Sequence, residues 1–599
     1  MKPKTMFFVV QMLLSVLLLI AMSASAASPA QASQAPAPVL APGSGSWEAV
    51  GSGTNDSVWD MAIDNTGMLY AVGKFTDAGV GYTKYIAKWD GASWSAVGTG
   101  VTDNSVYEVE VDRDNNVYIG GAFRGAGSMV YNKNFIAKWD GSTWSSMKNG
   151  MDGFVTALGV SRSGKVYAGG FFSKAGSTYV NNIATWGSGN WWPLGSGVNS
   201  AVNSIIVNGA GKVFAGGNFS KAGGKTVNYI AKWNGSEWSA VGGGMNAQII
   251  ALAFDSNGNL YAGGAFTTAG GNNAKHIAKW NGKTWRRLGT GMNGNVSAIA
   301  VDIDGNVYAG GTFTTAGGKP INNIAVWNGS EWSAVGGGMN GSVAALTLDT
   351  TGNLYAGGVF TTAGGITANH IAKWNTGNIF IDGFENGKLN AWSSKTGVSM
   401  RGDYNQFGTA AALCKLCVLP KAAKIGRYGL QVRALDNLPH FLTDTSPAAE
   451  TTYNARVYLK LKPLIMGDLN EIKLFQARDG TKPVVQILVR KKGLYFQIKA
   501  ITKLDNGNNM GTKWHIVPQR WVPVEVNWQA ATSSGTDDGY LKLFVGRKLK
   551  QHLEFLDNDT LAIKSVRLGI TSYLNATDNI SNFFYLDNFI SNNSYRIGP

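Results

Sequence analysis

Histidine and cysteine, which supply many catalytic and metal-binding groups, are scarce in this sequence. It has five histidines and two cysteines among 599 residues. It also lacks a Gly-x-Ser-x-Gly elbow, a His-Glu-x-x-His zinc motif and a Gly-rich phosphate loop. The usual patterns of serine hydrolases, zinc proteases and nucleotide-binding enzymes are therefore absent. A fold alone does not exclude an enzyme, but these absences favour a protein that does not catalyse a reaction.

The two cysteines stand close together, as Cys414-Lys-Leu-Cys417. A zinc site would need two further ligands at fitting spacing, and none is nearby in the sequence. A redox site would need a helix start in a βαβ context, which the surrounding sequence lacks. An exported protein meets oxidising conditions, so we expect a local disulfide between Cys414 and Cys417 that fixes a loop.

The N-terminus has the pattern of a secretory signal. Two lysines precede an apolar run over residues 6–22, and Ser-Ala-Ser-Ala follows at 23–26. Small residues at this place favour cleavage after Ala26, whereas the alternative is a membrane anchor of nearly minimal length. Residues 27–45, rich in Ala, Pro, Ser and Gln, are predicted to form a disordered spacer. We therefore expect a signal peptide at 1–26 and a secreted protein that has no transmembrane segment after cleavage.

One pattern recurs seven times between residues 46 and 375. A Gly-rich stretch ends in an aromatic residue and is followed by Ile-Ala-x-Trp, with units 47 to 49 residues apart. The aromatic residue is Phe75, Phe123, Phe172, Phe219, Phe266, Phe313 or Phe360. A period of this length with several short strands per unit is typical of β-propellers rather than helical solenoids. The sequence therefore predicts an all-β fold with a seven-bladed β-propeller at 46–375.

Each unit is predicted to contain four strands and no helix. In the unit from Trp238 to Asn281, the apolar and alternating segments that predict strands are 238–242, 249–255, 260–266 and 277–280. The Gly263-Gly264 pair carries no side chains, which would let a neighbouring unit or the central axis approach closely.

The first strand of the array is expected to close it. The array begins with a Trp-x-x-Val strand at Trp47 and ends at Trp374 without another strand of this type. An open array would expose an unpaired strand edge, and closure removes that edge. We therefore expect residues 47–51 to pair with the strand at 371–374.

The basic character of the chain belongs mainly to residues 376–599. This part contains 28 Lys and Arg against 18 Asp and Glu, whereas residues 46–375 contain 22 against 19. Runs such as Arg490-Lys491-Lys492 and Arg547-Lys548-Leu549-Lys550 add to the charge. Such a balance favours anionic partners, among them cell-wall polymers, lipopolysaccharide, acidic glycans and nucleic acid. The alternative is a solvated surface with dispersed lysines.

Strand patterns and turns alternate throughout residues 376–599, which predicts an antiparallel β-sandwich of two sheets. Its beginning, from Ile381 to Trp392, and its end, from Tyr585 to Ile590, resemble the jelly-roll modules of bacterial secreted proteins, of the concanavalin A-like or laminin G-like kind. The repeats are similar to the Gly-rich, Kelch-like propeller repeats of secreted surface proteins. The expected fold is thus a seven-bladed propeller followed by a jelly roll.

The jelly-roll resemblance implies a structural calcium ion. The first and last strands of such modules lie side by side, and acidic residues there often hold Ca²⁺. Glu385 and Asp587 fall on this pattern, and Asp382 is a weaker third ligand. Carboxylate oxygens suit calcium. The alternative is that these are ordinary carboxylates at strand ends.

These observations predict a secreted, non-catalytic binding or adhesion protein. The jelly roll would engage a glycan or an anionic surface polymer, and the propeller would be a rigid platform for a protein partner at one mouth. One alternative is a secreted carbohydrate-active enzyme in which the jelly roll is a targeting module and acids in the propeller act on the substrate. Another is a structural component of the cell envelope.

Overall fold

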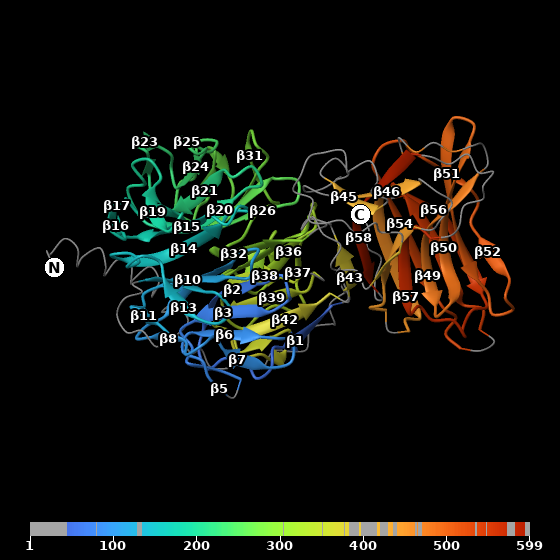
Figure 1. The fold of residues 1–599 in the computed structure, drawn as a ribbon, viewed down its shortest axis with the longest axis horizontal. Coiled ribbons are helices and arrows are strands. Elements are labelled where there is room, and N and C mark those ends of the chain that lie inside the picture. Colours follow the sequence, from blue (N-terminus) through green and yellow to red (C-terminus); the bar gives the residue numbers. More distant parts are fainter. Residues whose placement is uncertain are drawn as a thin grey trace. The chain divides into compact units, whose positions relative to one another are not determined.

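The computed structural model describes residues 45–592 apart from positions 80, 128–134, 303–304, 350–351, 377, 383–393, 397–415, 420–428, 435–439, 448, 462–463, 465, 467–469, 534–535, 547 and 572–581. Within these residues the chain is all β and contains no helix (Figure 1). The prediction of an all-β chain is therefore confirmed for the described residues.

Seven antiparallel sheets of four strands each follow one another between residues 46 and 375 (Figure 1). Their first strands are β2 (Val58–Ile63), β9 (Val106–Val111), β14 (Phe154–Val160), β20 (Val202–Val207), β26 (Ile249–Phe254), β32 (Val296–Val301) and β38 (Val343–Leu348). Their second strands are β3 (Leu69–Gly73), β10 (Val117–Gly121), β15 (Val166–Phe171), β21 (Val213–Gly217), β27 (Leu260–Gly264), β33 (Val307–Gly311) and β39 (Leu354–Gly358).

The outer half of each sheet consists of a third and a fourth strand. The third strands are β6 (Ile86–Trp89), β12 (Ile136–Trp139), β18 (Ile183–Gly187), β24 (Ile230–Trp233), β30 (Ile277–Trp280), β36 (Ile324–Trp327) and β42 (Ile371–Asn375). The fourth strands are β7 (Trp94–Ala96), β13 (Trp144–Ser146), β19 (Asn190–Pro193), β25 (Trp238–Ala240), β31 (Trp285–Arg287), β37 (Trp332–Ala334) and, for the last sheet, β1 (Ser46–Ala49).

Four strands per sheet are confirmed, although the strand predicted to begin the unit at Trp238 is the last strand of the preceding sheet. The Gly-rich loop adds a short two-stranded hairpin. The hairpins pair β4 (Asp77–Ala78) with β5 (Gly81–Tyr82), β8 (Val101–Thr102) with β11 (Gly125–Ala126), β16 (Lys174–Ala175) with β17 (Thr178–Tyr179), β22 (Lys221–Ala222) with β23 (Lys225–Thr226), β28 (Thr268–Ala269) with β29 (Asn272–Asn273), β34 (Thr315–Ala316) with β35 (Lys319–Pro320), and β40 (Thr362–Ala363) with β41 (Ile366–Thr367).

The first strand of the chain completes the last sheet, as expected. β1 lies beside β42 (Figure 1). The two strands pair antiparallel, and Trp47 lies directly opposite Trp374. The seven first strands also contact one another in sequence order, and β38 contacts β2. Both the outer strand pairing and the contacts of the first strands therefore join the last unit to the first.

Neighbouring units are held together by tryptophan side chains and by closely packed glycines. Trp238, which begins β25, is buried, and its indole N–H donates to the carbonyl of Leu194 in the preceding unit (2.8 Å). A Cβ added at Gly263 would lie 2.6 Å from Val296 in the next unit, which confirms the close approach predicted for this glycine. At Gly264 the added Cβ would instead meet the backbone carbonyl of Gln248 in the same unit.

The remaining strands form two antiparallel sheets of eight strands each. The first, called the β48 sheet, contains β43 (Asn378–Asp382), β45 (Leu416–Leu419), β46 (Gly429–Ala434), β48 (Thr452–Lys460), β54 (Val522–Gln529), β55 (Gly539–Val545), β56 (Lys548–Leu556) and β58 (Asn582–Asn592). The second, called the β50 sheet, contains β44 (Ser394–Thr396), β47 (His440–Asp444), β49 (Glu471–Asp479), β50 (Lys482–Lys492), β51 (Tyr495–Lys503), β52 (Asn509–Gly511), β53 (His515–Val517) and β57 (Ser565–Ile570).

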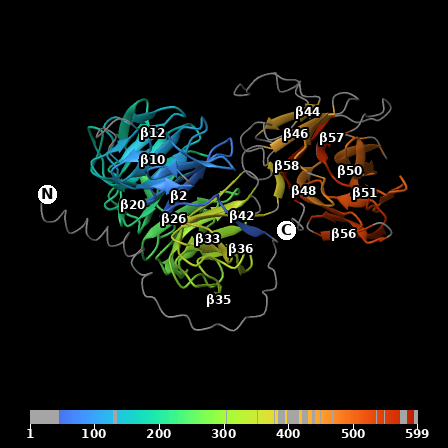
Figure 2. The same cartoon turned by 90° about the horizontal axis from the view of Figure 1, so that it is seen from below.

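The two sheets share one hydrophobic core, which contains Trp528 of β54 together with Ile487 and Val489 of β50. Trp528 is fully buried, and its indole N–H donates to the hydroxyl of Thr502 in the β50 sheet (3.0 Å). Figure 2 shows β50, β51 and β57 in a layer beside the layer that contains β48 and β58. The first strand of this part, β43, pairs with the last, β58, as the sequence resemblance led us to expect.

Candidate anion-binding face

The outer face of the β50 sheet is determined by the alternation of side chains along its strands. On β51, Phe496, Ile498 and Ala500 are buried in the shared core, so the residues between them point away from it. Residues directly opposite each other on paired strands share a face. Lys499 lies opposite Leu488 of β50, and Leu488 lies opposite Lys473 of β49. These three residues therefore form one row across the outer face.

Five cationic side chains lie on this outer face, which we call the basic face. They are Lys473 and Arg478 of β49, Arg490 of β50, Lys499 of β51 and Arg567 of β57. All five are half-buried. None of them forms an ion pair within the described part of the chain, although Lys564 nearby pairs with Asp479 (2.7 Å). Glu471 of β49 lies directly opposite Arg490 but forms no ion pair with it, so the face keeps an excess of positive charge among the described residues.

One end of the basic face is organised around Trp514. The guanidinium of Arg490 lies 4.1 Å from the centre of the indole ring, and the ammonium of Lys499 lies 4.7 Å from it. Such contacts hold cations over the negative face of the ring. Arg490 Nε also donates to the side-chain oxygen of Gln497 (3.0 Å). These contacts hold Arg490 in place and leave other donors of its guanidinium available.

The other end carries a pair of guanidinium groups. Arg567 lies opposite Gln476, and Arg478 donates to the side-chain oxygen of the same Gln476 (2.8 Å). The Arg567 guanidinium also stacks over Phe441, 4.5 Å from the ring centre. Burial, and then the positive charge of Arg567, lowers the pKa of Arg478. The Nε atoms of both arginines are buried without a hydrogen-bond partner.

Two guanidinium groups held near each other repel, and buried donors without acceptors cost free energy. A carboxylate, sulfate or phosphate would relieve both costs, because a planar guanidinium matches their paired oxygens. This end of the face is thus suited to an oxyanion.

Apolar side chains border the basic face at the β50–β51 turn and on β53. Tyr495 is 57% exposed and Ile516 is 54% exposed. Ile516 lies opposite Gln497 and therefore points to the same side as the basic face. Rings and apolar surface beside cations suit a ligand that has both charged groups and weakly polar faces, as sugar rings do.

The basic runs seen in the sequence are divided by the strand geometry. Arg490 lies opposite Gln497 on the basic face, whereas its neighbour Lys491 lies opposite Phe496, whose side chain is in the core. Lys548 and Lys550 are exposed on β56, in the other sheet, and Arg547 lies outside the described residues. The basic face is therefore assembled from four strands rather than from either run.

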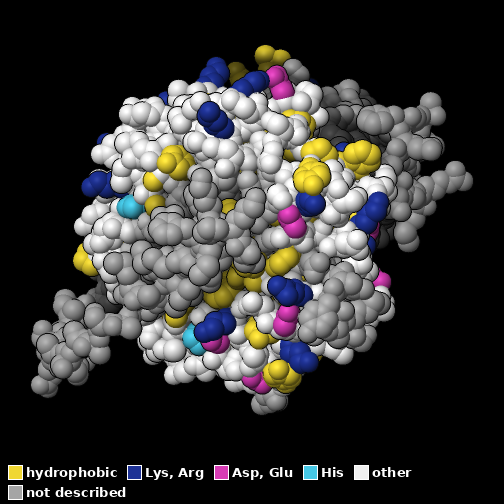
Figure 3. All heavy atoms as spheres, turned by 90° about the vertical axis from the view of Figure 1, so that its left-hand side faces the viewer, with side chains coloured by type: hydrophobic (Ala, Val, Ile, Leu, Met, Phe, Trp, Pro, Cys, Tyr) yellow, Lys and Arg dark blue, Asp and Glu magenta, His cyan; other side chains and the backbone are white. Residues whose placement is uncertain are grey.

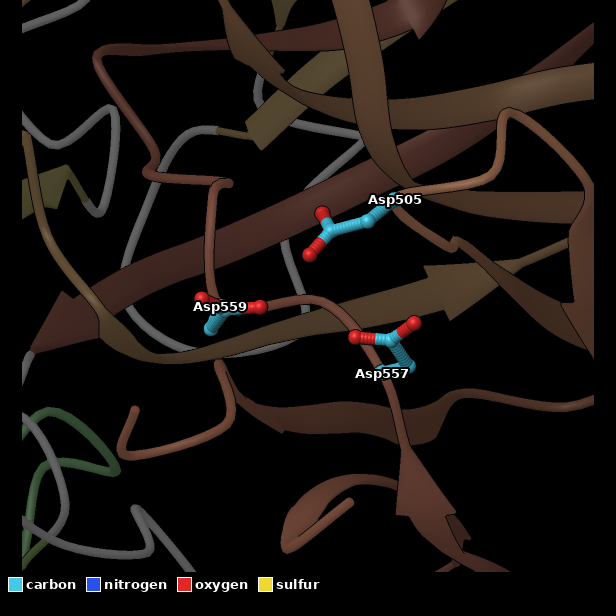
Figure 4. A group of neighbouring side chains, drawn as sticks. All are labelled: Asp505, Asp557 and Asp559. Carbon is cyan, nitrogen blue, oxygen red and sulfur yellow. The ribbon is translucent and has the colours of Figure 1, made fainter. Parts of the chain in front are cut away.

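Three aspartates, Asp505, Asp557 and Asp559, lie together at another edge of this part (Figure 4). One carboxylate oxygen from each aspartate lies within 4.8 Å of one from each of the others. A hydrogen bond with Asp505 raises the pKa of Asp559, which is consistent with a proton shared between the two. The hydroxyl of Thr560 also donates to Asp505. Exposed acids of this kind often occur without a bound ion, and no other contact of the described residues points to one here.

The predicted calcium ligands are only partly described. Asp587 is fully buried on β58 and lies opposite Tyr458 of β48. Asp382 ends β43 opposite Phe589, and Glu385 lies outside the described residues. The predicted disulfide is also only partly described, because Cys417 lies on β45 but Cys414 lies outside the described residues. Calcium and the disulfide therefore stay predictions.

If calcium binds at Asp587 and Glu385, chelation should destabilise the part of the chain formed by residues 376–599. A ligand bound by the folded state alone stabilises it by RT ln(1 + [L]/Kd), about 2.7 kcal/mol at a hundredfold excess over Kd. We expect calorimetry of the full chain to show a lower melting temperature for this transition in EDTA, and no shift for the repeats. Asp587→Asn should abolish the difference between EDTA and calcium. Equal transitions in EDTA and in calcium would exclude the site.

Charge is arranged differently on the side of the molecule where β14 and β16 lie. Figure 3 shows the described Lys and Arg side chains of this side in separate places, with acidic and hydrophobic side chains between them. The exposed lysines Lys225 and Lys319 each pair with a glutamate, Glu237 or Glu331. The charge on this side of the molecule is therefore dispersed, unlike that of the basic face, and two exposed lysines of the repeats are paired with glutamates.

No protein-family model matches the chain, and a search of curated proteins finds no match. Among solved structures, endo-β-1,4-glucuronan lyase from the fungus Trichoderma reesei matches at 12% identity over 36% of this chain and 95% of its own, with a TM-score of 0.26. The extracellular domain of a protein named as a hybrid two-component system from B. thetaiotaomicron matches at 11% identity over 85% of this chain and 66% of its own, with a TM-score of 0.40. An alginate lyase, Aly36B, matches at 14% identity over 28% of this chain and 84% of its own, with a TM-score of 0.21.

TM-scores below 0.5 do not establish a shared fold, and identities this low do not transfer a substrate. The function is therefore argued from the basic face itself. The described residues contain no helix long and apolar enough to cross a membrane.

Proposed function

We propose that this protein is an exported binding protein that holds an acidic glycan on the basic face of the β50 sheet and does not catalyse a reaction. The observation that carries the proposal is the group of five cations on one sheet face, none of which forms an ion pair in the described structure. Unneutralised cations that are held in place by neighbouring side chains are prepared for an anionic ligand.

Two further features favour a glycan over another anion. Tyr495, which is 57% exposed beside the basic face, offers a ring on which the apolar side of a sugar can stack. The side-chain oxygen of Gln497 accepts a hydrogen bond from Arg490, and its amide group carries donors for a hydroxyl group. The buried amide of Gln476 already donates to Gln486 (3.5 Å). Nucleic acid shares the negative charge, and the experiment below includes it as a competitor.

We further propose that the seven four-stranded sheets are the blades of a closed β-propeller over residues 46–375, followed by a jelly roll over 376–599. The pairing of β1 with β42 and the contact of β38 with β2 support closure. A closed ring has no free sheet edge and is a rigid platform, which suits a protein partner at one mouth. Export rests on the signal-like residues 1–26.

The proposal is tested by removing the guanidinium pair. Arg478→Gln together with Arg567→Gln should weaken binding of the full chain to polygalacturonate at least about tenfold, since a hydrogen bond to a charged group contributes about 1.5–3 kcal/mol. The measurement is isothermal titration at low salt and again near 1 M salt, where the Debye length falls to about 3 Å. Salt should weaken binding by the wild type more than binding by the variant.

Lys548→Gln together with Lys550→Gln is the matched control, because it removes the same charge from exposed positions of the other sheet. This control should keep nearly the wild-type affinity. Equal losses in both double variants, or equally tight binding of single-stranded DNA, would show unspecific attraction and contradict the proposal. Formation of new chain ends in the polymer during the titration would show cleavage and would contradict the proposal that the protein does not catalyse a reaction.

A further inference from the structure

The first strands of all seven sheets share a β-bulge near their start. It follows the first paired residue in six of them and the second, Val155, in β14. In β2 the pairing with β3 shifts between Val58 and Asp60, so Trp59 has no partner on β3. The same shift follows Val106, Val155, Val202, Ile249, Val296 and Val343. A bulge changes the direction in which the neighbouring side chains point. The residue two places after the one that precedes the shift therefore has the same position in every unit.

Carboxyl groups occupy these equivalent positions in the first two units alone. Two places after the residue that precedes the shift, the seven units have Asp60, Glu108, Ala157, Ser204, Ala251, Ala298 and Ala345 in turn. Four places after it, they have Ala62, Glu110, Gly159, Ile206, Ala253, Ala300 and Thr347. Since β2 contacts β9, Asp60, Glu108 and Glu110 lie on adjacent strands of neighbouring units. Small or uncharged residues suffice in the other five units, so the fold does not require acids here.

The carboxyl group of Asp60 bridges the two units. Its Oδ2 accepts a hydrogen bond from the backbone N–H of Val109 in β9 (2.8 Å). Ser204 does the same in a later unit, where its hydroxyl accepts from the N–H of Leu252 (3.2 Å). A neutral side chain can therefore make this bridge, because a backbone donor needs an acceptor oxygen and not a negative charge.

The strands packed around the three acids supply no positive charge. β2 and β9 contact β3, β10, β14, β38 and β39, and none of these seven strands contains Lys, Arg or His. Their other titratable groups are Tyr107 on β9, Tyr70 on β3, Tyr118 on β10 and Tyr355 on β39. The hydroxyl of Tyr118 donates to Asp112 (3.0 Å), and Tyr70 bonds to Asp64, so these two are engaged at the turns.

Aromatic residues directly precede Asp60 and Glu108 on their strands. Trp59 and Tyr107, the bulge residues next to Asp60 and Glu108, have ring centres 5.3 Å apart. Tyr107 in turn packs against Phe154 of the third unit, with ring centres 6.4 Å apart. Rings beside a carboxyl group replace water, and this disfavours the charged form.

The electrostatics agree with this geometry. Burial, followed by repulsion from Asp60, raises the pKa of Glu110 to about 8. Burial raises the pKa of Asp60, and burial followed by repulsion from Asp60 raises that of Glu108 well above its usual range. The three acids are half-buried on adjacent strands, and like charges placed in this way favour retention of protons by the group.

We infer that Asp60, Glu108 and Glu110 form a protonated carboxyl cluster that joins the first two repeat units and weakens this interface as the pH rises. At acidic pH the neutral groups do not repel one another, and Asp60 accepts the hydrogen bond from the N–H of Val109. At alkaline pH the carboxylates repel each other with no cation on the surrounding strands to offset them. The inference concerns the repeats and does not rest on the binding proposed for the basic face.

The direction of the pH effect follows from proton binding. Unfolded Asp and Glu titrate near pH 4, whereas the clustered groups keep their protons to about pH 7–8, so the folded state binds more protons between these values. The stabilisation is complete below pH 4, is lost as the pH rises through this window and stays lost above it. One unit of difference in pKa corresponds to a tenfold change in the unfolding constant.

The experiment is urea unfolding of the full chain between pH 5 and pH 9. We expect the unfolding constant of the repeats to rise at least about tenfold from pH 5 to pH 8. Asp60→Asn, Glu108→Gln and Glu110→Gln combined should remove most of this rise, since the amides keep acceptor oxygens. Glu237→Gln is the matched control, because this exposed, ion-paired acid titrates below the window. It should leave the rise unchanged.

A direct readout on the wild type makes the test independent of the variants. The infrared C=O band of protonated carboxylic acids should be present in the native protein at pH 6 and disappear by pH 9. Absence of this band at pH 6 would overturn the inference, even if the triple variant failed to fold. A triple variant that folds but keeps the pH-dependent rise would overturn it as well.

Discussion

Replacing Trp47 with alanine is expected to lower the free energy of unfolding of the repeats by about 3–5 kcal/mol, the cost typical of truncating a buried tryptophan. Trp47 is 7% exposed, and its ring centre lies 5.3 Å from that of Trp374. Its indole N–H donates to the carbonyl of Val335 (3.1 Å). The substitution thus removes contacts between the first strand of the chain and two segments near the end of the array. Urea unfolding followed by circular dichroism measures the loss.

Trp192→Ala is the control for this prediction. Trp192 is also a tryptophan of a fourth strand, β19, but it is 55% exposed. Its truncation should change the free energy of unfolding by no more than about 0.5 kcal/mol, as for most surface substitutions. If Trp47→Ala unfolded at the same urea concentration as the wild type, the first strand would not hold the last unit, and the proposed closure of the ring would be contradicted.

The repeat architecture was predictable because its signals are local. Turn residues, apolar runs and the Ile-Ala-x-Trp pattern occur in every unit, so the same four strands are predicted seven times. The pairing of Trp47 with the strand of Trp374 is a long-range contact, yet it followed from counting strands, because the array begins with a strand type that is missing at its end. The two-stranded hairpins were missed, because their strands of two residues are too short for a hydrophobic period.

The basic face could not be predicted from the sequence. Its members lie as far apart as Lys473 and Arg567, and the order of strands in the sheet, which brings β57 beside β49, is a tertiary property. The run Arg490-Lys491-Lys492 was a misleading signal, since successive residues of a strand point to opposite faces. Register shifts in β49, between Lys473 and Phe475 and between Ala477 and Arg478, further change which residues share the face.

The carboxyl cluster was missed although the sequence contained a signal for it. The net charge of the repeats is close to neutral, and this average conceals Asp60, Glu108 and Glu110. A position-by-position comparison of the seven first strands would have shown acids where the other units have uncharged and mostly small residues. Their contact across two units depends on the bulge and on the packing of β2 against β9, which only the structure gives.

Gly264→Ala is expected to destabilise the repeats by about 3 kcal/mol, at the upper end of the cost of overpacking. The bulge of β26 brings the backbone carbonyl of Gln248 against Gly264, and an added Cβ would overlap that oxygen. A backbone atom cannot rotate away as a side chain does, so β27 would have to move. The N–H of Gly264 donates to the carbonyl of His276 (3.1 Å) and that of Ala265 to Gln248 (3.1 Å), and both bonds would be strained.

Gly81→Ala separates this overlap from the general effect of adding a methyl group. Gly81 lies on the short strand β5 and has open space around the position of a Cβ. Neither Gly81 nor Gly264 has a positive φ. Both substitutions therefore reduce the freedom of the unfolded chain equally, and only the overlap differs. Gly81→Ala should be neutral or slightly stabilising in urea unfolding. Equal midpoints for the two variants would mean that the carbonyl of Gln248 can move aside, and that the bulge does not require glycine opposite it.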